Sequence, residues 1–390
     1  MSVSSSPGWK HLFQRALAAA PERLHMAAHS HHLWPDASYV GHLAAWDDGV
    51  RLADRKWDRV MGEIWPGAQR HVAIELGLPG PDSIVFATNT HELILRLVSA
   101  HPGKRPLRVL ASDGEFHSFR RQAARWEEAG EIMLETVPVA GGGFDDRLLA
   151  RARSGTHDII FTSQVMFGSG LVFDQLSALA ELADPAGPWV VVDGYHGFMA
   201  IETDLGGVAD RLFYLAGGYK YGMAGEGAAF MHAPPGFGPR PIVTGWYGAF
   251  EDLAAAPGSV GFAGDARRFM GATFDPSGLY RFVAVRDMLA EEGLTTARIS
   301  AHVAGLRDRL LDGIGATPLA RADLLNPPGA GPQARFLAFR SPHATEWKRR
   351  LDGEEVIVDV RGDVIRIGLG LYHDERDIDR LLPSLIRLDG

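Results

Sequence analysis

Short apolar runs rich in β-branched residues alternate with longer stretches of helical spacing between about residues 41 and 253. In chain order, the clearest runs are Ser83–Phe86, Leu107–Leu110, Asp158–Phe161, Trp189–Val192 and Leu212–Leu215. A polar or glycine-containing turn follows each run, as is typical of βαβ units whose helices connect the strands of a mostly parallel sheet. A helix over residues 173–183 is expected to form one of these connections.

The pattern changes at the glycine-rich stretch over residues 258–265. The remaining elements are predicted as helices over 277–292, 295–313 and 374–385, and strands over 334–340, 356–360 and 364–368. Gly362 and Asp363 lie between two apolar runs and predict a hairpin turn. Because 390 residues exceed the ~250–300 at which single cores stop growing, we expect two domains. The predicted division is a large domain over 41–265, a small α+β domain over 266–390, and an N-terminal segment over 1–40 that packs with the small domain.

Composition narrows the class of protein. The net charge is −9, with 39 basic and 48 acidic residues, which gives no electrostatic support for nucleic-acid binding. The chain contains no cysteine, so it has neither disulfides nor cysteine-bound metal. No apolar run reaches the ~20 residues of a membrane helix, and residues 9–20 predict an amphipathic helix that ends near Pro21. We therefore expect no membrane association and a cytoplasmic location.

Two of the strand-like runs lead into residues whose side chains can bind a cofactor. Asp193 ends the run Trp189–Val192, and Lys220 follows the run Leu212–Leu215 within a glycine-rich turn. A lysine can form a Schiff base with the aldehyde of pyridoxal phosphate (PLP), and a carboxylate can keep its ring nitrogen protonated. The carboxyl ends of parallel strands are where α/β folds bind ligands. The alternative is a surface lysine and an aspartate that caps a helix.

Further residues predict the other parts of a PLP site. Asn89 and Thr90 follow a strand and precede a helix, so the Thr90 hydroxyl is expected to bind the phosphate, unless it only caps the helix. Phe116 or His117, after another strand, is expected to stack on the ring, whereas burial in the core is the alternative for the phenylalanine. Tyr219, beside the lysine, is a second candidate for the phosphate.

Two further side chains are candidates, one at the cofactor and one for the substrate. His196 follows Asp193 closely and is expected to contact the cofactor's phenolic oxygen or to relay protons, although a structural role is the alternative. Arg366 interrupts the apolar run Val364–Ile367, and a buried guanidinium needs an anion. That anion is either a substrate carboxylate or an internal partner such as Asp359.

Together these motifs resemble the class V branch of fold-type I PLP enzymes, and within it most closely kynureninase. The resemblance extends from about residue 25 to the end and rests on residues 191–196 and 218–221, on Gly-Trp-Tyr-Gly at 245–248, and on residues 359–366 followed by Leu371-Tyr372. It implies a large domain with a mostly parallel mixed sheet flanked by helices, and a smaller α+β domain. It also implies a homodimer with active sites at the interface, in which Trp246 reaches the neighbouring site and Thr273 the partner's phosphate. Arg366 would bind the amino-acid carboxylate.

The reaction that this resemblance implies is hydrolysis of the Cβ–Cγ bond of kynurenine or a related β-keto amino acid, with Lys220 transferring the proton. One departure is the family's small-residue motif, which corresponds loosely to residues 28–32 here. Ser30 and His31 are therefore expected to face the substrate. The histidines at 29, 31 and 32 suggest metal binding only weakly, since Asp36 is the one nearby carboxylate, and we predict no metal. The segment 57–67 also lacks a clear copy of the family's substrate-side histidine.

Two alternative functions stay open. The first is a class V aminotransferase, epimerase or β-lyase acting on another amino acid. Cysteine desulfuration through a persulfide on the chain's own cysteine is excluded, because there is no cysteine. The second is a non-catalytic protein that binds or regulates, against which the presence of Lys220, Asp193 and Arg366 together argues.

Overall fold

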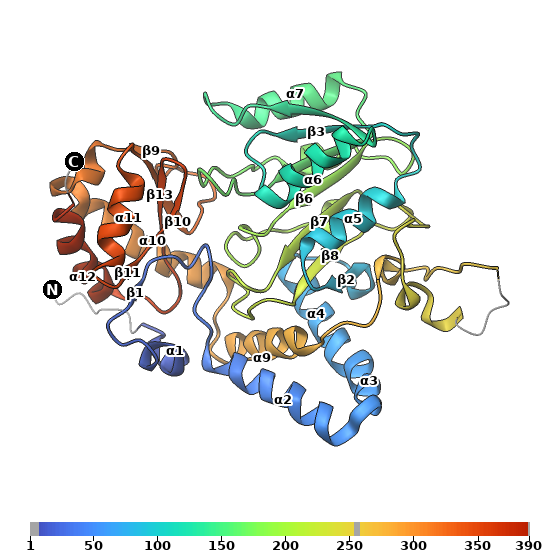
Figure 1. Ribbon diagram of the computed structural model, residues 1–390, viewed down its shortest axis with the longest axis horizontal. Helices are drawn as coiled ribbons and strands as arrows, with labels where there is room; N and C mark the ends of the chain where they lie inside the picture. The colour runs from blue at the N-terminus through green and yellow to red at the C-terminus, as the bar shows by residue number, and fades with distance from the viewer. Residues whose placement is uncertain (1–7, 253–257, 389–390) are drawn as a thin grey trace.

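The computed structural model describes residues 8–252 and 258–388. The first seven residues of the predicted N-terminal segment, and residues 253–257 of the predicted large domain, lie outside these ranges. Figure 1 shows a central sheet with helices on both of its faces, and a smaller α+β unit beside it that carries the C-terminal elements. This layered α/β arrangement agrees with the alternation of short apolar runs and helices in the sequence.

The central sheet has seven strands in the order β2-β8-β7-β6-β5-β3-β4. Its strands are β2 (Ile84–Ala87), β3 (Leu107–Ser112), β4 (Ile132–Val137), β5 (Ile159–Ser163), β6 (Trp189–Asp193), β7 (Leu212–Gly217) and β8 (Ala229–His232). Within this sheet, β8 alone runs antiparallel to its neighbours, β7 and β2. The prediction of a mostly parallel mixed sheet is therefore confirmed.

Helices between β2 and β6 connect strands of this sheet, and further helices precede β2 or follow β8 (Figure 1). In chain order they are α1 (Gln14–Ala18), α2 (Asp36–Leu52), α3 (Lys56–Arg59), α4 (Trp65–Glu75), α5 (Thr90–Ala100), α6 (His117–Glu128), α7 (Phe144–Ser154), α8 (Leu176–Ala180) and α9 (Ser277–Glu291). The predicted helix over 173–183 is wrong in extent, because α8 is much shorter. Within the described ranges, the structure has no helix long and apolar enough to cross a membrane.

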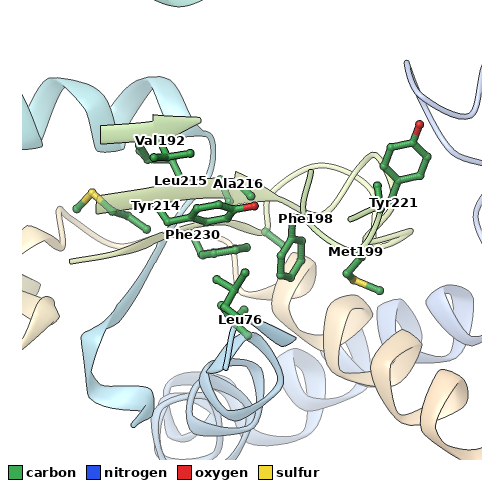
Figure 2. Close-up of a cluster of buried hydrophobic side chains, with 14 of the residues drawn as sticks. Leu76, Val192, Phe198, Met199, Tyr214, Leu215, Ala216, Tyr221 and Phe230 are labelled. Carbon is green, nitrogen blue, oxygen red and sulfur yellow. The ribbon is translucent and has the colours of Figure 1, made fainter. Parts of the chain in front are cut away.

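The strands of the sheet interior are apolar on both faces because helices cover both sides. All of Trp189–Val192 in β6 is buried. Phe119 of α6 stacks on Phe161 of β5 with ring centroids 3.8 Å apart. On the opposite face, Tyr214 and Phe230 pack together with Leu76 at the end of α4 (Figure 2). This core fixes the strand ends that carry the polar residues.

The smaller unit is built on an antiparallel sheet of order β12-β13-β10-β9. It comprises β9 (Asp323–Leu324), β10 (Phe336–Arg340), β12 (Asp359–Arg361), β13 (Val364–Gly368), α10 (Thr296–Gly313), α11 (Ala344–Asp352) and α12 (Glu375–Ile386). The predicted hairpin at Gly362 is confirmed, since β12 and β13 pair antiparallel around it and its φ of 59° suits glycine. Asp374 caps α12 through a capping box.

The N-terminal part joins both units. β1 (Leu24–His25) pairs in parallel with β11 (Val356–Ile357) of the C-terminal part. Helix α2 crosses the predicted boundary at residue 40 and packs against α9, where Gly41 allows close contact with the backbone of Tyr280. The Tyr280 hydroxyl donates to the buried Asp48 carboxylate over 2.8 Å. Helix α2, at the start of the predicted large domain, is thereby joined to α9, which the predicted division assigns to the small domain.

Candidate active site

The carboxyl ends of β2, β3, β5, β6 and β7 lie at one edge of the sheet, because these strands are parallel. A cavity of about 660 Å³ opens at this edge. Seven predicted site residues line it: Asn89, Thr90, Phe116, Asp193, His196, Tyr219 and Lys220. The folded chain thus brings together side chains from four separate loops, as expected at the carboxyl ends of parallel strands.

Lys220 is the buried amine of this cavity. Its side chain follows β7, and the residue is only 6% exposed. Three aromatic rings surround Nζ, with their centroids at 4.8 Å for Tyr219, 5.4 Å for Tyr195 and 5.9 Å for Phe116. Burial, aided by the positive charge of Arg366, lowers the pKa of Lys220 to about 7. The surface-lysine alternative is therefore wrong, and a large share of this amine is neutral near pH 7.

Asp193 ends β6, the strand next to the one that leads to Lys220. Its Oδ1 accepts a hydrogen bond from the backbone N–H of Tyr195 over 2.9 Å. Burial raises the pKa of Asp193, while that hydrogen bond and the charge of Lys220 oppose the rise. The Lys220 amine and the Asp193 carboxyl thus line the same cavity, and burial disfavours the charged form of both.

The N-terminus of α5 also points to this edge of the sheet. Asn89 is the N-cap, since its side chain accepts a hydrogen bond from the Glu92 backbone N–H over 2.9 Å. The cap alternative for Thr90 is therefore wrong: Thr90 is the first helical residue, and its hydroxyl has no hydrogen-bond partner among the described residues. Free backbone N–H groups and a hydroxyl at a helix start favour the binding of an anion such as phosphate.

Of the two stacking candidates, Phe116 lines the cavity and His117 does not. Phe116 precedes α6 in an extended conformation and is half-buried, with its ring against Phe167 at 5.3 Å. The centroid of this ring lies 5.9 Å from Nζ of Lys220. This arrangement leaves an aromatic surface for a flat ligand.

His196 lines the cavity and is 6% exposed. Burial, together with the charges of Lys220 and Arg366, holds the pKa of His196 well below its usual range, so the ring is neutral. Its Nδ1 is buried without a hydrogen-bond partner among the described residues. The His29 ring lies 6.5 Å away, and both of its nitrogens also lack hydrogen-bond partners. Each unpaired buried group of this kind needs an explanation, and a ligand contact is one that fits the place of His196 in the cavity.

Arg366 lies behind Phe167, outside the cavity lining, and is 2% exposed. It forms a buried ion pair with Asp359 and donates to the carbonyl oxygen of Phe167. Asp359, which the sequence offered as an alternative internal partner of Arg366, is therefore bound to it. The same carboxylate also pairs with Arg361 at 2.9 Å, so two guanidinium groups share one negative charge. Because the Nε of Arg366 is buried without a hydrogen-bond partner, the cluster retains a donor and excess positive charge for a second anion.

The remaining predicted residues do not line the cavity of their own chain. His31 is exposed and stacks on Tyr219 at 5.0 Å, so it lies at the rim, with Ser30 beside it at 3.4 Å from its Nδ1. Trp246 is 42% exposed, and Thr273 is exposed too. A single chain does not test the role that Trp246 and Thr273 are expected to have in a partner's site, so that role stays a prediction.

Comparison with known proteins identifies the fold. No family model matches the chain. Isopenicillin N epimerase of Streptomyces clavuligerus is 27% identical over 333 residues, which cover 80% of this chain and 81% of that protein. The cystine C–S lyase C-DES, in complex with its product cysteine persulfide, has a TM-score of 0.82 at 16% identity and covers 96% of this chain and 100% of its own. A cysteine desulfurase from Thermococcus onnurineus has a TM-score of 0.79 at 17% identity, with 98% of each chain covered.

At this identity the structural likeness shows the fold alone. The chain has the fold of fold-type I PLP enzymes. The kynureninase interpretation gains no support from these relatives, which are an epimerase, a C–S lyase and a desulfurase.

The side chains of this fold-type I chain fit PLP. The cavity offers an amine to the aldehyde, a carboxyl to the ring nitrogen, an aromatic face to the ring and a helix N-terminus to the phosphate. The unpaired Nδ1 of His196 supplies a further polar contact. By contrast, the described residues contain no cluster of three or more His, Asp or Glu side chains suited to holding a metal ion.

The sequence analysis missed a buried carboxyl beneath this site. Glu115 is fully buried, and its oxygens accept from the hydroxyls of Ser112 and Ser163, each over 2.5 Å. Burial raises the pKa of Glu115 to about 7, against the effect of these hydrogen bonds. Ser163 lines the cavity and pairs with Asp193 across the sheet. A signal for Glu115 was its position directly before Phe116, but its partner Ser163 is distant in the sequence.

Proposed function

We propose that this protein is a PLP-dependent enzyme of the class V type that acts on the α-carbon of an amino acid. The observation that carries the proposal is the buried Lys220 amine, beside Asp193, in a cavity of about 660 Å³ at the carboxyl ends of the parallel strands. A cavity of this size is typical of cofactor and small-molecule sites. The 27% identity with isopenicillin N epimerase over 80% of the chain supports the same class.

When bound, PLP supplies the ring that accepts electrons from the substrate's α-carbon. The chain's own residues position the reactants and move the proton. Nζ of Lys220, with its pKa of about 7, would take the α-proton, and inversion at the α-carbon would need a proton delivered to its opposite face. Asp193 would hold the proton of the ring nitrogen, and Phe116 would fix the plane of the ring.

Binding of the two anionic groups follows from the elements around the cavity. The phosphate would lie at the N-terminus of α5, with the Thr90 hydroxyl and, from the other side, the Tyr219 hydroxyl as donors. The substrate carboxylate would accept a hydrogen bond from Nε of Arg366, the nitrogen of this guanidinium that has no partner among the described residues, in a cluster where Arg361 adds positive charge. His31 at the rim and His196 in the cavity would contact the part of the substrate beyond the α-carbon.

Among the possible reactions, we favour epimerisation at the α-carbon, because isopenicillin N epimerase is 27% identical to the chain over 333 residues. β-Elimination is the second candidate, since the C–S lyase C-DES shares the fold over nearly the whole chain. Kynurenine hydrolysis ranks below both. The persulfide route of cysteine desulfurases is excluded, because the chain has no cysteine to carry the sulfur.

The test is to incubate the PLP-loaded protein in heavy water with a panel of L-amino acids that includes L-cystine and L-kynurenine. Loss of the α-proton signal with appearance of the D-isomer would support epimerisation, and release of pyruvate from cystine would support elimination. Anthranilate and alanine from kynurenine would restore the hydrolase interpretation. The control is Lys220→Ala, which we expect to lose all of these activities and the visible absorption of lysine-bound PLP. Absence of that absorption in the wild-type protein would overturn the proposal.

A further inference from the structure

A second cavity, of about 510 Å³, lies between the two units of the molecule. Its walls come from the loop after β6 (Ala200 and Ile201), from α10 (Ser300, Val303 and Ala304) and from the residues that lead into β10. Most of these side chains are apolar. None of the residues that line this cavity also lines the catalytic cavity.

The unusual feature of this second cavity is Arg335, which lines it and is 5% exposed. Its Nη2 donates to Ser300 Oγ over 2.9 Å and to the Thr296 carbonyl oxygen over 3.2 Å. No carboxylate among the described residues forms an ion pair with Arg335. Its Nη1 likewise has no hydrogen-bond acceptor in the described parts of the chain. Burial lowers the pKa of Arg335 to about 10, which still leaves the guanidinium charged near neutral pH.

A second buried arginine provides a comparison for the surroundings of Arg335. Arg268 is 4% exposed, and its Nε and Nη2 donate to the carbonyl oxygens of Pro234, Phe237 and Gly238. Arg335 likewise donates from Nε and Nη2, but to a hydroxyl and one carbonyl oxygen, and it lines a cavity with mostly apolar walls. A charge without a carboxylate partner is costly in such surroundings.

The other charged groups at the cavity do not neutralise Arg335. Arg307 also lines the cavity, but it pairs with Asp308 at 2.8 Å. Glu202 is exposed. On its other side, Arg335 faces the ring of Tyr221 at 5.3 Å. Burial lowers the pKa of Arg335 and the negative charge of Glu75 opposes this change, but Glu75 forms its ion pair with Arg286, at 2.7 Å. The cavity therefore offers the positive charge of Arg335 within walls that are mostly apolar.

We propose that this inter-domain cavity is a second, non-catalytic binding site for a small amphipathic carboxylate. The carboxylate would accept from Nη1 of Arg335, and an aliphatic chain would lie against Ile201, Val303 and Ala304. A volume of about 510 Å³ is typical of small-molecule pockets. Phe336 lines this cavity and stacks on His29 at 4.6 Å, so a bound ligand is one aromatic ring away from the histidines beside the active site.

The test uses octanoate as the probe with the PLP-loaded full chain, and isothermal titration calorimetry as the measurement. We expect saturable binding of one octanoate per chain, and at least tenfold weaker binding of 1-octanol, which lacks the carboxylate. Arg335→Gln should weaken octanoate binding at least tenfold. Ala304→Phe should do the same by filling the cavity without touching the guanidinium, and it decides the matter if the arginine variant does not fold. Lys220→Ala should bind octanoate as the wild type does.

Three outcomes would overturn the proposal. Absence of saturable binding to the wild type is the first, and equal binding of 1-octanol, which would indicate an apolar pocket without anion recognition, is the second. The third is loss of octanoate binding in Lys220→Ala but not in Ala304→Phe, which would assign the binding to the catalytic cavity. Since the assay needs no turnover, it is independent of the proposed enzymatic reaction.

Discussion

At Lys220, folding moves an amine out of water and into a cavity walled by aromatic rings. Burial lowers its pKa from the ordinary 10.5 to about 7, so the unfolded chain binds the proton more readily than the folded one. Between these two pKa values the stability of the PLP-free protein gains from rising pH. Below about pH 7 the whole cost of burying the charge is present.

We therefore expect Lys220→Met to raise the unfolding temperature of the PLP-free protein at about pH 6, by an amount that corresponds to at most a few kcal/mol. The gain should shrink toward pH 10, where the wild-type amine is neutral in the folded state. Thermal unfolding across this range measures the difference between variant and wild type. Lys104→Met, at an exposed lysine, is the matched control and should show no such trend. A gain that is the same at every pH would contradict the assignment.

Arg366 and Arg361 provide a comparison within one cluster, because both pair with the Asp359 carboxylate. Only Arg366 is deeply buried, and only its Nε lies buried without a partner. Arg366→Lys should raise KM for the amino-acid substrate about tenfold or more with a smaller change in kcat, since an ammonium cannot replace the planar fork. Arg361→Lys is the control and should leave KM within about twofold. Equal effects from both would return Arg366 to a purely structural role.

Two adjacent residues at the start of helix α5 have different roles: one caps the helix, and the other is predicted to bind the phosphate. Asn89 caps the helix, whereas the Thr90 hydroxyl has no hydrogen-bond partner among the described residues. Asn89→Ala should lower the stability of the PLP-free protein by about 1 kcal/mol. Thr90→Val should leave that stability nearly unchanged and weaken PLP binding. Chemical denaturation of the PLP-free form and equilibrium titration with PLP measure the two effects. A stability loss in Thr90→Val equal to that in Asn89→Ala would contradict the phosphate role.

The sequence predicted strands and turns well where the pattern of apolar residues and the residue types of the turn indicated the same structure. Gly362 marked the β12–β13 hairpin, and the runs ending at Asp193 and leading to Lys220 became neighbouring buried strands. Contacts distant in sequence could not be predicted in this way. Glu115 accepts hydrogen bonds from Ser163, 48 positions away, and Arg335 donates hydrogen bonds to residues of α10, so their unusual environments became visible only in the folded chain. The length of α8 was wrong because its flanking apolar residues pack as loops.

At the scale of the whole molecule, the exposed apolar side chains are not scattered evenly. On α2 they recur at helical spacing, with Val40, Leu43, Trp46 and Val50 at 63%, 40%, 63% and 65% exposure. Ile242 and Trp246 add to the exposed apolar surface. Surface of this kind is typical of a protein–protein interface, and it agrees with the predicted homodimer. We expect sedimentation to give a dimer, and a fully active monomer would contradict this.

A mixing experiment tests whether the active site is shared between subunits. Trp246 does not line the cavity of its own chain, whereas Lys220 does. We expect Lys220→Ala to be inactive and Trp246→Ala to lose most activity. If Trp246 serves the neighbouring site, a hybrid dimer of the two variants contains one site with both native residues. Equal mixing after dissociation and reassociation should then restore roughly a quarter of wild-type activity, because about half of the dimers are hybrids and each has one good site of two.

If Trp246 served its own chain, every site in the hybrid would carry one defect and mixing would restore nothing. Mixing Lys220→Ala with Asp193→Ala is the control, since both lie in one chain's cavity, and the hybrid should stay inactive.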